Sequence, residues 1–327
     1  MEIKAGISKL FRSKWISLVL VTVVIAALFW SLNHSYLTPD SLRGIALAAS
    51  LSGTLAVGMG CLLISGHVDL AAGAEGMMGG VLLAILIRAG VTWPLAIVLT
   101  LAAGAVFGLI NAFFVNGLGF MAFITTIGMS SVYRGVGYVI TKSDNVPIGV
   151  ENAGFYKIGS AVVLGIPVPF IIMIVLLAVY GLMLTNTRFG RSVYMCGGNR
   201  NAARLAGIDP KRITTILFVN SGVLAALGGI VTAARMHFGG PGSVIGAEMD
   251  AITAAVLGGI AFTGGSGGML GCFLGLILIN SFKSGLTAVG LPAYYQSFAQ
   301  GILLVLALAL DYFNEKSRQK ALKAQTE

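Results

Sequence analysis

The sequence predicts an all-α, polytopic membrane protein with about ten transmembrane helices and an inverted internal repeat. The first observation behind this prediction is composition, since hydrophobic residues make up 57% and charged residues only 10% of the 327 residues. With a mean hydropathy of +0.91, the chain has too little polar surface for a water-soluble globule. The second observation is a series of long apolar stretches, and the third is a pair of strings that occur twice.

The apolar stretches are long enough to cross a bilayer, which takes about 20 residues in a helix. Ten stretches qualify: 15–32, 44–65, 70–88, 93–115, 121–141, 162–184, 213–234, 250–265, 267–288 and 294–312. Only the glycine-rich segment 263–268 separates the eighth from the ninth, as a tight turn or as a break within one buried region. We expect a single membrane domain over residues 1–327, without a separate soluble domain.

The distribution of basic residues predicts the topology. The first apolar stretch follows Lys4, Lys9, Arg12 and Lys14, but it is too long for a signal peptide and lacks a small-residue cleavage pattern. We therefore predict a retained first helix. Ten crossings with both termini in the cytoplasm put most basic residues inside, including those of the loop at about 185–212, as the positive-inside rule requires. The net charge of +9 then needs no nucleic-acid partner.

The main polar interruption of the apolar sequence is the segment 197–210 within this loop. Asn199 is a good N-cap, Gly207 suits the left-handed position after a helix, and Pro210 prevents continuation. These signals predict a helix of about two turns. A helix of that size is marginal in water by itself, so it needs the membrane surface or a second protein to pack against.

Several common sites are missing from the sequence. No Gly-x-x-x-x-Gly-Lys-Ser/Thr motif occurs, so the chain cannot hold nucleotide phosphates in the P-loop manner, and any ATP would be bound by another subunit. The histidines and cysteines lack metal-ligand or paired spacing, and we assign no cofactor, metal or redox role to them: His34, His67, His237, Cys61, Cys196 and Cys272.

Two short strings recur in order. Gly73-Ala74-Glu75 is followed by Leu109-Ile110-Asn111-Ala112-Phe113, and Gly246-Ala247-Glu248 is followed by Leu278-Ile279-Asn280-Ser281-Phe282. An odd number of predicted crossings separates the two copies, so they would have opposite orientations in the membrane. Inverted repeats of this kind build the central path of many transporters.

Polar residues near the repeat junctions are the candidates for this path: Asp69, Glu75, Asn111, Asn220, Glu248, Asp250 and Asn280. A carboxylate within hydrocarbon costs about 2.5–3.5 kcal/mol, so a buried one needs a partner or water. The alternative is that the four carboxylates lie at span ends in the headgroup region, where they would stabilise helix N-termini. The asparagines would then form interhelical hydrogen bonds. We expect Arg134 to reach outward to the membrane surface.

Several passages together resemble the bacterial ABC-type monosaccharide permeases, the family of the ribose, xylose, galactose and autoinducer-2 importers. They are Gly66–Gly73, Asn186–Arg191, Gly197–Ile208, and the run Glu248–Gly259 continued by Gly264–Gly268. The resemblance extends over residues 44–312. The chain departs from the family pattern at Val68 and at Ala71-Ala72, where the family commonly has Ile and Ser-Val. The missing serine hydroxyl would alter solute contacts if this turn lines the path.

The resemblance implies a permease subunit of the bacterial inner membrane that pairs with a second permease copy, identical or different. An ATPase subunit would bind below it, and a periplasmic or lipid-anchored sugar-binding protein above it. The resemblance also implies that the loop around the short helix couples the permease to the ATPase. The coupling positions would be Gly197, Gly198, Asn199, Ala202, Ala203 and Gly207.

The function expected from these observations is import of a monosaccharide or similar polyol by alternating access, driven by the separate ATPase. The chain itself would not be an enzyme. One alternative is a branched-chain amino-acid permease of the same ATP-driven type. A second is a secondary carrier without an ATPase, which the absence of ionisable residues deep in the spans disfavours. A purely structural membrane protein would not need a long, capped basic loop on one face.

Overall fold

The computed structural model describes residues 14–323 and contains thirteen α-helices in that part of the chain. The helices are α2 (Lys14–Leu32), α3 (Pro39–Ile64), α4 (Ala72–Arg88), α5 (Trp93–Ala112), α6 (Ala122–Thr141), α7 (Ala153–Ser160), α8 (Val168–Asn186), α9 (Arg188–Gly198), α10 (Arg200–Leu205), α11 (Pro210–Met236), α12 (Ala247–Leu257), α13 (Met269–Ala288) and α14 (Ala293–Lys323). Four two-residue strands form two antiparallel pairs, β1 (Val146–Pro147) with β4 (Phe238–Gly239) and β2 (Val162–Val163) with β3 (Ile166–Pro167).

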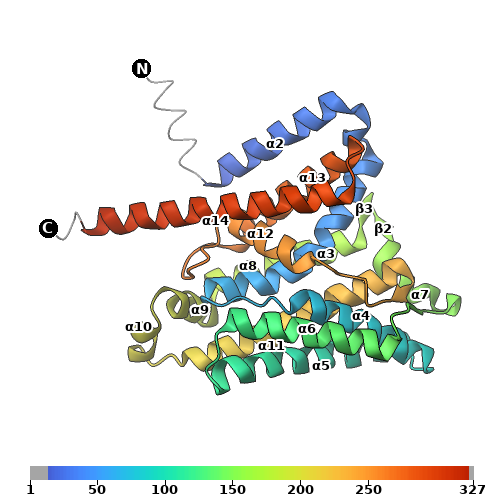
Figure 1. Ribbon diagram of the computed structural model, residues 1–327, viewed down its shortest axis with the longest axis horizontal. Helices are drawn as coiled ribbons and strands as arrows, with labels where there is room; N and C mark the ends of the chain where they lie inside the picture. Colours follow the sequence, from blue (N-terminus) through green and yellow to red (C-terminus); the bar gives the residue numbers. More distant parts are fainter. Residues whose placement is uncertain (1–13, 324–327) are drawn as a thin grey trace.

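The long helices are stacked in layers (Figure 1). Helices α4, α5, α6 and α11 form one layer, α2, α13 and α14 lie on the opposite side, and α3 and α8 run between them. The start of α2, the loop with α9 and α10 and the end of α14 lie toward one end of the molecule, whereas α7 and the β2–β3 hairpin lie toward the other. That the basic loop and both termini face the cytoplasm stays a prediction. Lys4, Lys9 and Arg12 lie outside the described residues.

Six helices are long and apolar enough to cross a membrane: Trp15–Leu32, Pro39–Ile64, Trp93–Gly117, Val168–Asn186, Pro210–Met236 and Met269–Ala288. Each of the ten predicted stretches contains a helix, but the prediction over 250–265 is wrong in extent. Helix α12 ends at Leu257 and has 11 residues, about 16 Å at 1.5 Å per residue. Gly259 adopts a left-handed conformation, with φ of +86°, and the apolar residues beyond it form a loop.

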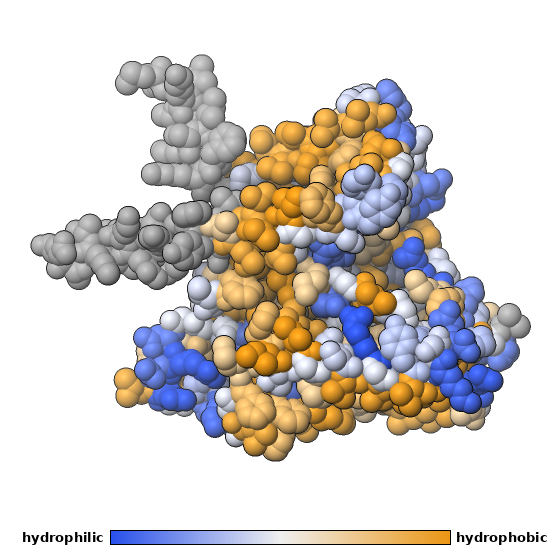
Figure 2. Space-filling view, viewed as in Figure 1, coloured by the Kyte–Doolittle hydropathy of each residue, from blue (hydrophilic) through white to orange (hydrophobic). Residues whose placement is uncertain are grey.

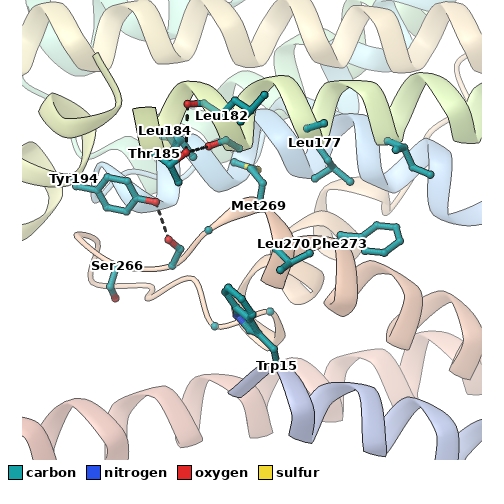
Figure 3. Close-up of a pocket in the computed structure, with 17 residues that line it drawn as sticks. Trp15, Leu177, Leu182, Leu184, Thr185, Tyr194, Ser266, Met269, Leu270 and Phe273 are labelled. Atoms are coloured by element: carbon teal, nitrogen blue, oxygen red, sulfur yellow. Dashed lines mark hydrogen bonds between the residues drawn. The ribbon is translucent and has the colours of Figure 1, made fainter. Parts of the chain in front are cut away.

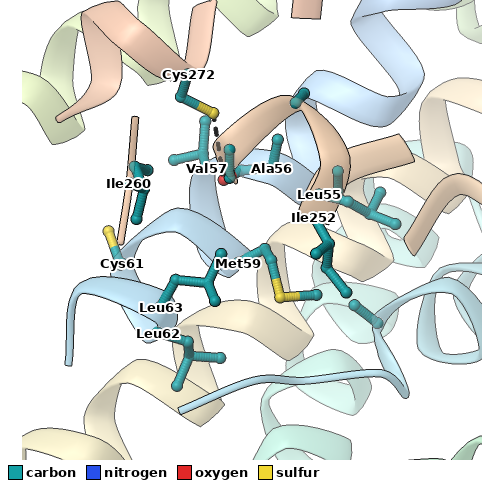
Figure 4. Close-up of a cluster of buried hydrophobic side chains, with 14 of the residues drawn as sticks. Leu55, Ala56, Val57, Met59, Cys61, Leu62, Leu63, Ile252, Ile260 and Cys272 are labelled. Carbon is teal, nitrogen blue, oxygen red and sulfur yellow. Dashed lines mark hydrogen bonds between the residues drawn. The ribbon is translucent and has the colours of Figure 1, made fainter. Parts of the chain in front are cut away.

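The core is centred on α3 and α11. Within the most apolar 18 residues of each helix, 83% of the residues of α3 and 72% of those of α11 are buried, compared with 6% for α2. The side chains of α3 from Leu55 to Leu63 interlock with Ile252, Ile260 and Cys272 (Figure 4), and the Cys272 thiol lies 3.8 Å from the carbonyl oxygen of Ala56. The helices that hold the candidate polar residues therefore pack on a rigid centre.

Two helices begin inside the molecule. After α3 ends, residues 65–71 lead to α4, and after α11 ends, residues 237–246 lead to α12. Neither α4 nor α12 has a side-chain N-cap. Their first turns meet, since a Cβ atom on Gly73 would lie 1.9 Å from Glu248 Oε2. The chain after α11 also runs back along α4, where a Cβ atom on Gly239 would lie 2.1 Å from the Gly80 carbonyl oxygen.

Candidate functional site

Asp69 is fully buried in the segment that leads into α4. Its Oδ1 accepts a hydrogen bond from the Ala71 backbone N–H at 3.1 Å, and its Oδ2 accepts one from the Ser221 hydroxyl at 2.8 Å. Ser221 lies about 16 Å along α11 from its first residue and about 22 Å from its last. Asp69 is therefore held near the middle of this helix, and a headgroup position at a span end is wrong for it.

Glu75 and Asn111 extend this buried network into α4 and α5. The Asn111 amide donates to Glu75 Oε1 at 2.8 Å and approaches Asp69 Oδ1 at 3.5 Å, and the Tyr133 hydroxyl donates to Asn111 Oδ1 at 3.3 Å. Asp69, Glu75 and Asn111 are 0% exposed. Glu75 Oε2 is buried and has no hydrogen-bond partner among the described residues. We call Asp69, Glu75, Asn111, Tyr133 and Ser221 the sealed network.

Two ion pairs form a second cluster at the start of α12. Arg134 on α6 lies 2.8 Å from Glu248, and Lys283 on α13 lies 2.8 Å from Asp250. The basic side chains of both pairs are about one quarter exposed, 26% for Arg134 and 25% for Lys283. We call these four residues the ion-pair strip. The expectation that Arg134 reaches outward to the membrane surface is wrong, because a carboxylate from another helix holds it.

The remaining path candidates have separate partners. Asn280 donates to the Ser52 hydroxyl at 3.3 Å and to the Leu276 carbonyl at 2.9 Å, and it is 3% exposed. Asn220 accepts a hydrogen bond from the Tyr180 hydroxyl, while its amide nitrogen is buried with no partner in the described chain. The structure brings Asp69, Glu75 and Asn111 together and leaves these two asparagines apart from them.

The basic loop at about 185–212 contains the predicted short helix, α10. Asn199 Oδ1 accepts hydrogen bonds from the backbone of Asn201 and Ala202, both at 3.0 Å, and Gly207 has a φ of +78°. Pro210 does more than end this helix, because it forms the first turn of α11. Leu205 at the end of α10 is 91% exposed, whereas Ala203 is fully buried. Helix α10 thus presents an apolar side chain to its surroundings.

Helix α9 was not predicted, and it contains two of the coupling positions. Gly197 packs against the end of α3, where a Cβ atom would lie 1.8 Å from the Ile64 carbonyl oxygen. The same carbonyl accepts a hydrogen bond from the Gly265 backbone at 2.8 Å. Gly198 has more room, since a Cβ atom there would meet only Gly265 Cα, at 4.0 Å. The glycine-rich segment 263–268, which is part of the α12–α13 connection, therefore packs against both the loop and the end of α3.

The His67 and Cys196 side chains near the loop are in their uncharged forms at pH 7, which does not suit them to acid–base or nucleophilic catalysis. Burial, and then the nearby charge of Arg200, lowers the pKa of His67 to about 4, so its imidazole is neutral at pH 7. Burial raises the pKa of the Cys196 thiol, which keeps it protonated. Within residues 14–323, no three His, Cys, Asp or Glu side chains are grouped so that they could hold a metal ion.

A cavity of about 900 Å³ lies between α8, the glycine-rich segment and Trp15 (Figure 3). Most of its lining side chains are aliphatic or aromatic. The Tyr194 hydroxyl donates to the Gly267 carbonyl at 2.8 Å, and the Thr185 hydroxyl to the Gly181 carbonyl at 2.9 Å. Because these hydroxyl protons are used within the protein, the cavity suits an apolar occupant better than a polyol.

The fold, the interior polar clusters and the capped loop are all features of a transporter subunit. Residues 41–308 match the family model described as "Branched-chain amino acid transport system / permease component". The chain belongs to this permease family. Membership confirms that the permease is a transport subunit and not an enzyme.

Curated relatives of the permease are sugar permeases. It is 32% identical to the L-arabinose ABC transporter permease of Azospirillum brasilense (92% of this chain, 88% of the relative). It is 33% identical to the ribose import permease of Bacillus subtilis (86% and 87%) and 34% identical to the D-allose transport permease of Escherichia coli (89% and 89%). No solved structure matches the permease. The relatives confirm the resemblance found in the sequence.

Two functional candidates of the structure, Arg134 and Lys283, were absent from the path residues predicted from sequence. Each is a basic residue within a predicted apolar span. A charge in that position signals a buried partner, and this signal could have indicated both ion pairs. Ser221 and Tyr133 give no comparable signal, because single hydroxyl groups are common in membrane helices.

Proposed function

We propose that the permease imports a monosaccharide by alternating access, driven by a separate ABC ATPase. The relatives that match most of its length are named for arabinose, ribose and allose. A neutral sugar also agrees with the polar interior, where the described carboxylates are bonded to amide, hydroxyl or basic groups of the protein. A second permease copy, a periplasmic or lipid-anchored sugar-binding protein and membrane lipid complete the assembly.

The exposed side chain of Leu205 is the observation that supports coupling of the permease to the ATPase. Helix α10 is too short to persist alone in water, and its caps on Asn199 and Gly207 hold it with its largest apolar side chain, Leu205, outward. We infer that α10 inserts Leu205 into an apolar groove of the ATPase and that Gly198 and Ala202 border this contact. The alternative of a helix lying on lipid, held by Arg200 and Arg204, predicts no loss of ATPase when Leu205 is changed.

The loop has a direct route to the interior. Gly197 contacts the end of α3 and Gly265 by backbone packing without intervening side chains. Displacement of α9 by the ATPase would therefore move the end of α3 and the segment that follows α12. Because both contacts are between backbone atoms, rotation of side chains cannot relieve a displacement of α9. Differential affinity of the ATPase for two such positions supplies the bias for alternating access.

We also infer ten crossings arranged as an inverted repeat, in which residues 237–246 and the short helix α12 together form the eighth. Both termini and the α9–α10 loop would lie in the cytoplasm of a bacterial inner membrane. In support, α4 and α12 each begin inside the molecule and follow a segment that returns from a helix end. The fourth residue of each, Glu75 and Asp250, is bonded to the next long helix, at Asn111 and Lys283. The recurring Gly-Ala-Glu strings are offset by two residues from this alignment.

The second candidate solute is a branched-chain amino acid, which the description of the family favours. Its charged ammonium and carboxylate would need fixed counter-charges along the path. The ion-pair strip is internally neutralised, so a neutral sugar fits it better. Uptake by the reconstituted complex with each class of binding protein decides between the two solutes.

The coupling proposal is tested by co-purification of the ATPase in detergent. We expect Leu205→Asp to weaken association at least tenfold, about 1.4 kcal/mol, because an aspartate cannot occupy an apolar groove. Leu164→Asp is the matched control, since Leu164 is 98% exposed in the hairpin at the opposite end, and it should retain the ATPase. Unchanged co-purification with Leu205→Asp would contradict this role of α10.

A further inference from the structure

The ion-pair strip lies inside the membrane part of the protein rather than at its surface. Arg134 lies about 10 Å along α6 from Thr141, and Lys283 lies about 8 Å along α13 from Ala288. Glu248 and Asp250 are in the first turn of α12, which begins in the interior. Three separate helices therefore bring four charged groups to the start of α12, as two ion pairs.

The surroundings of the strip are apolar. Hydrophilic atoms lie between two hydrophobic bands on the face where α14 and α6 run (Figure 2). Exposed side chains of these helices are Val132, Val136 and Val139 on α6, and Phe298, Ile302 and Val305 on α14. Partly exposed charges at this depth are costly in contact with lipid tails. The strip therefore needs water or another polar surface, and a second permease copy covering α6 and α14 would enclose such a space.

The chemistry of the strip suits a neutral polyol. Arg134 and Lys283 supply hydrogen-bond donors, and Glu248 and Asp250 supply acceptors beside them, while a sugar hydroxyl is both donor and acceptor. The two pairs sum to zero charge, so they retain neither an anion nor a cation strongly. Weak contacts of this kind let a solute enter and leave.

From these observations we propose that Arg134, Glu248, Asp250 and Lys283 line the solute path and contact the hydroxyl groups of the sugar as it passes. The inference rests on the proposed function and specifies its binding residues. It excludes the sealed network from the path, because Asp69, Glu75 and Asn111 have no exposed surface and are bonded to one another or to α11. Four of the seven polar positions suggested by the sequence then have structural roles. These are those three residues of the sealed network and Asn280, which is bonded to Ser52.

The test uses the full complex of permease, ATPase and binding protein in liposomes. Uptake of L-arabinose, D-ribose and D-allose by the unmodified complex is measured first, and no uptake of any of them would contradict the proposed function. The path itself is tested by labelling Asp250→Cys and Lys283→Cys with a charged methanethiosulfonate. Background labelling should be low, since Cys61, Cys196 and Cys272 are buried.

We expect labelling at positions 250 and 283 to be at least tenfold faster than at the control Glu75→Cys, and the imported sugar to slow it at least threefold. A labelling rate equal to that of the control, or one that the sugar does not change, would overturn the proposal. The labelling result is independent of the uptake result, so the two failures can be told apart.

The double variant Arg134→Glu with Glu248→Arg separates a solute contact from a structural brace. The exchange restores an ion pair between α6 and α12 but reverses donor and acceptor. We expect the assembled complex to elute as the unmodified one does, with the KM for the sugar raised at least tenfold. An unchanged KM would show that the pair only holds the helices together and would overturn the proposal for these two residues.

Discussion

The sealed network and the ion-pair strip are both polar clusters within the helical part of the permease, but they are built in opposite ways. The sealed network joins α4, α5, α6 and α11 through amide and hydroxyl groups, and its carboxylates have no exposed surface. The strip joins α6, α12 and α13 through full charges, and its basic side chains remain about a quarter exposed. The first arrangement fixes helices, whereas the second keeps hydrogen-bonding capacity available.

The difference follows from what each cluster faces. Asp69 lies against α11, one of the two most buried of the six long apolar helices, and Glu75 is bonded to α5. Removal of a partner there leaves an unsatisfied group. The strip lies at the start of α12, against α6 and α13, and its basic side chains are partly exposed, so water or a solute can replace a lost partner. Substitutions in the sealed network should therefore reduce stability, and substitutions in the strip should reduce transport.

The largest effect should come from Asp69→Ala in the sealed network. It leaves the Ser221 hydroxyl and the Ala71 backbone N–H without their acceptor, at a cost of about 3 kcal/mol. Thermal unfolding of the detergent-solubilised protein should show a lower midpoint. Asp69→Asn is the control, since its amide oxygen still accepts and the Ser221 hydroxyl can turn to accept from the new amide. Equal midpoints for Asp69→Ala and the unmodified protein would remove the structural role from this network.

A smaller effect, about 2 kcal/mol from overpacking, should follow from Gly197→Ala. The new methyl group would collide with the Ile64 carbonyl oxygen, whereas Gly198→Ala has space. Because this contact links the loop to α3, Gly197→Ala should also lower sugar-stimulated ATP hydrolysis relative to Gly128→Ala, a control on α6 where a Cβ atom would meet nothing within 4 Å. Equal rates of ATP hydrolysis for Gly197→Ala and Gly128→Ala would contradict a role of the backbone contact in coupling.

Local signals in the sequence were sufficient to predict the caps of the short helix and a helix within each long apolar stretch. Asn199, Gly207 and Pro210 specify their conformations through their own side chains or backbone freedom, and the structure has each of them at a cap or first turn. Helix α9 was missed because its amphipathic pattern is short and is interrupted by Gly190. Helix α12 was predicted too long, since hydropathy cannot tell a buried loop from a buried helix.

The pairing of polar residues could not be predicted from local signals. Asp69 and Ser221 are 152 positions apart and Arg134 and Glu248 are 114 apart, so their meeting depends on the tertiary fold. Local signals also could not distinguish fully buried carboxylates from those in partly exposed ion pairs. Glu75 and Glu248 occur in the same Gly-Ala-Glu string, yet one is bonded to an asparagine and the other to an arginine.

The smallest effect should come from Tyr133→Phe, which tests how the sealed network ends at α6. The Tyr133 hydroxyl is 3.3 Å from Asn111 Oδ1 and 3.1 Å from the Phe107 carbonyl, and its removal should cost about 1 kcal/mol of stability. Tyr138→Phe on the same helix is the matched control, because Tyr138 is 41% exposed and water can replace its contacts. Transport by both variants should remain near that of the unmodified complex. A clear loss of transport in Tyr133→Phe without a change in the unfolding midpoint would move this residue from the sealed network to the path, and the boundary between the two clusters would then lie on the other side of α6.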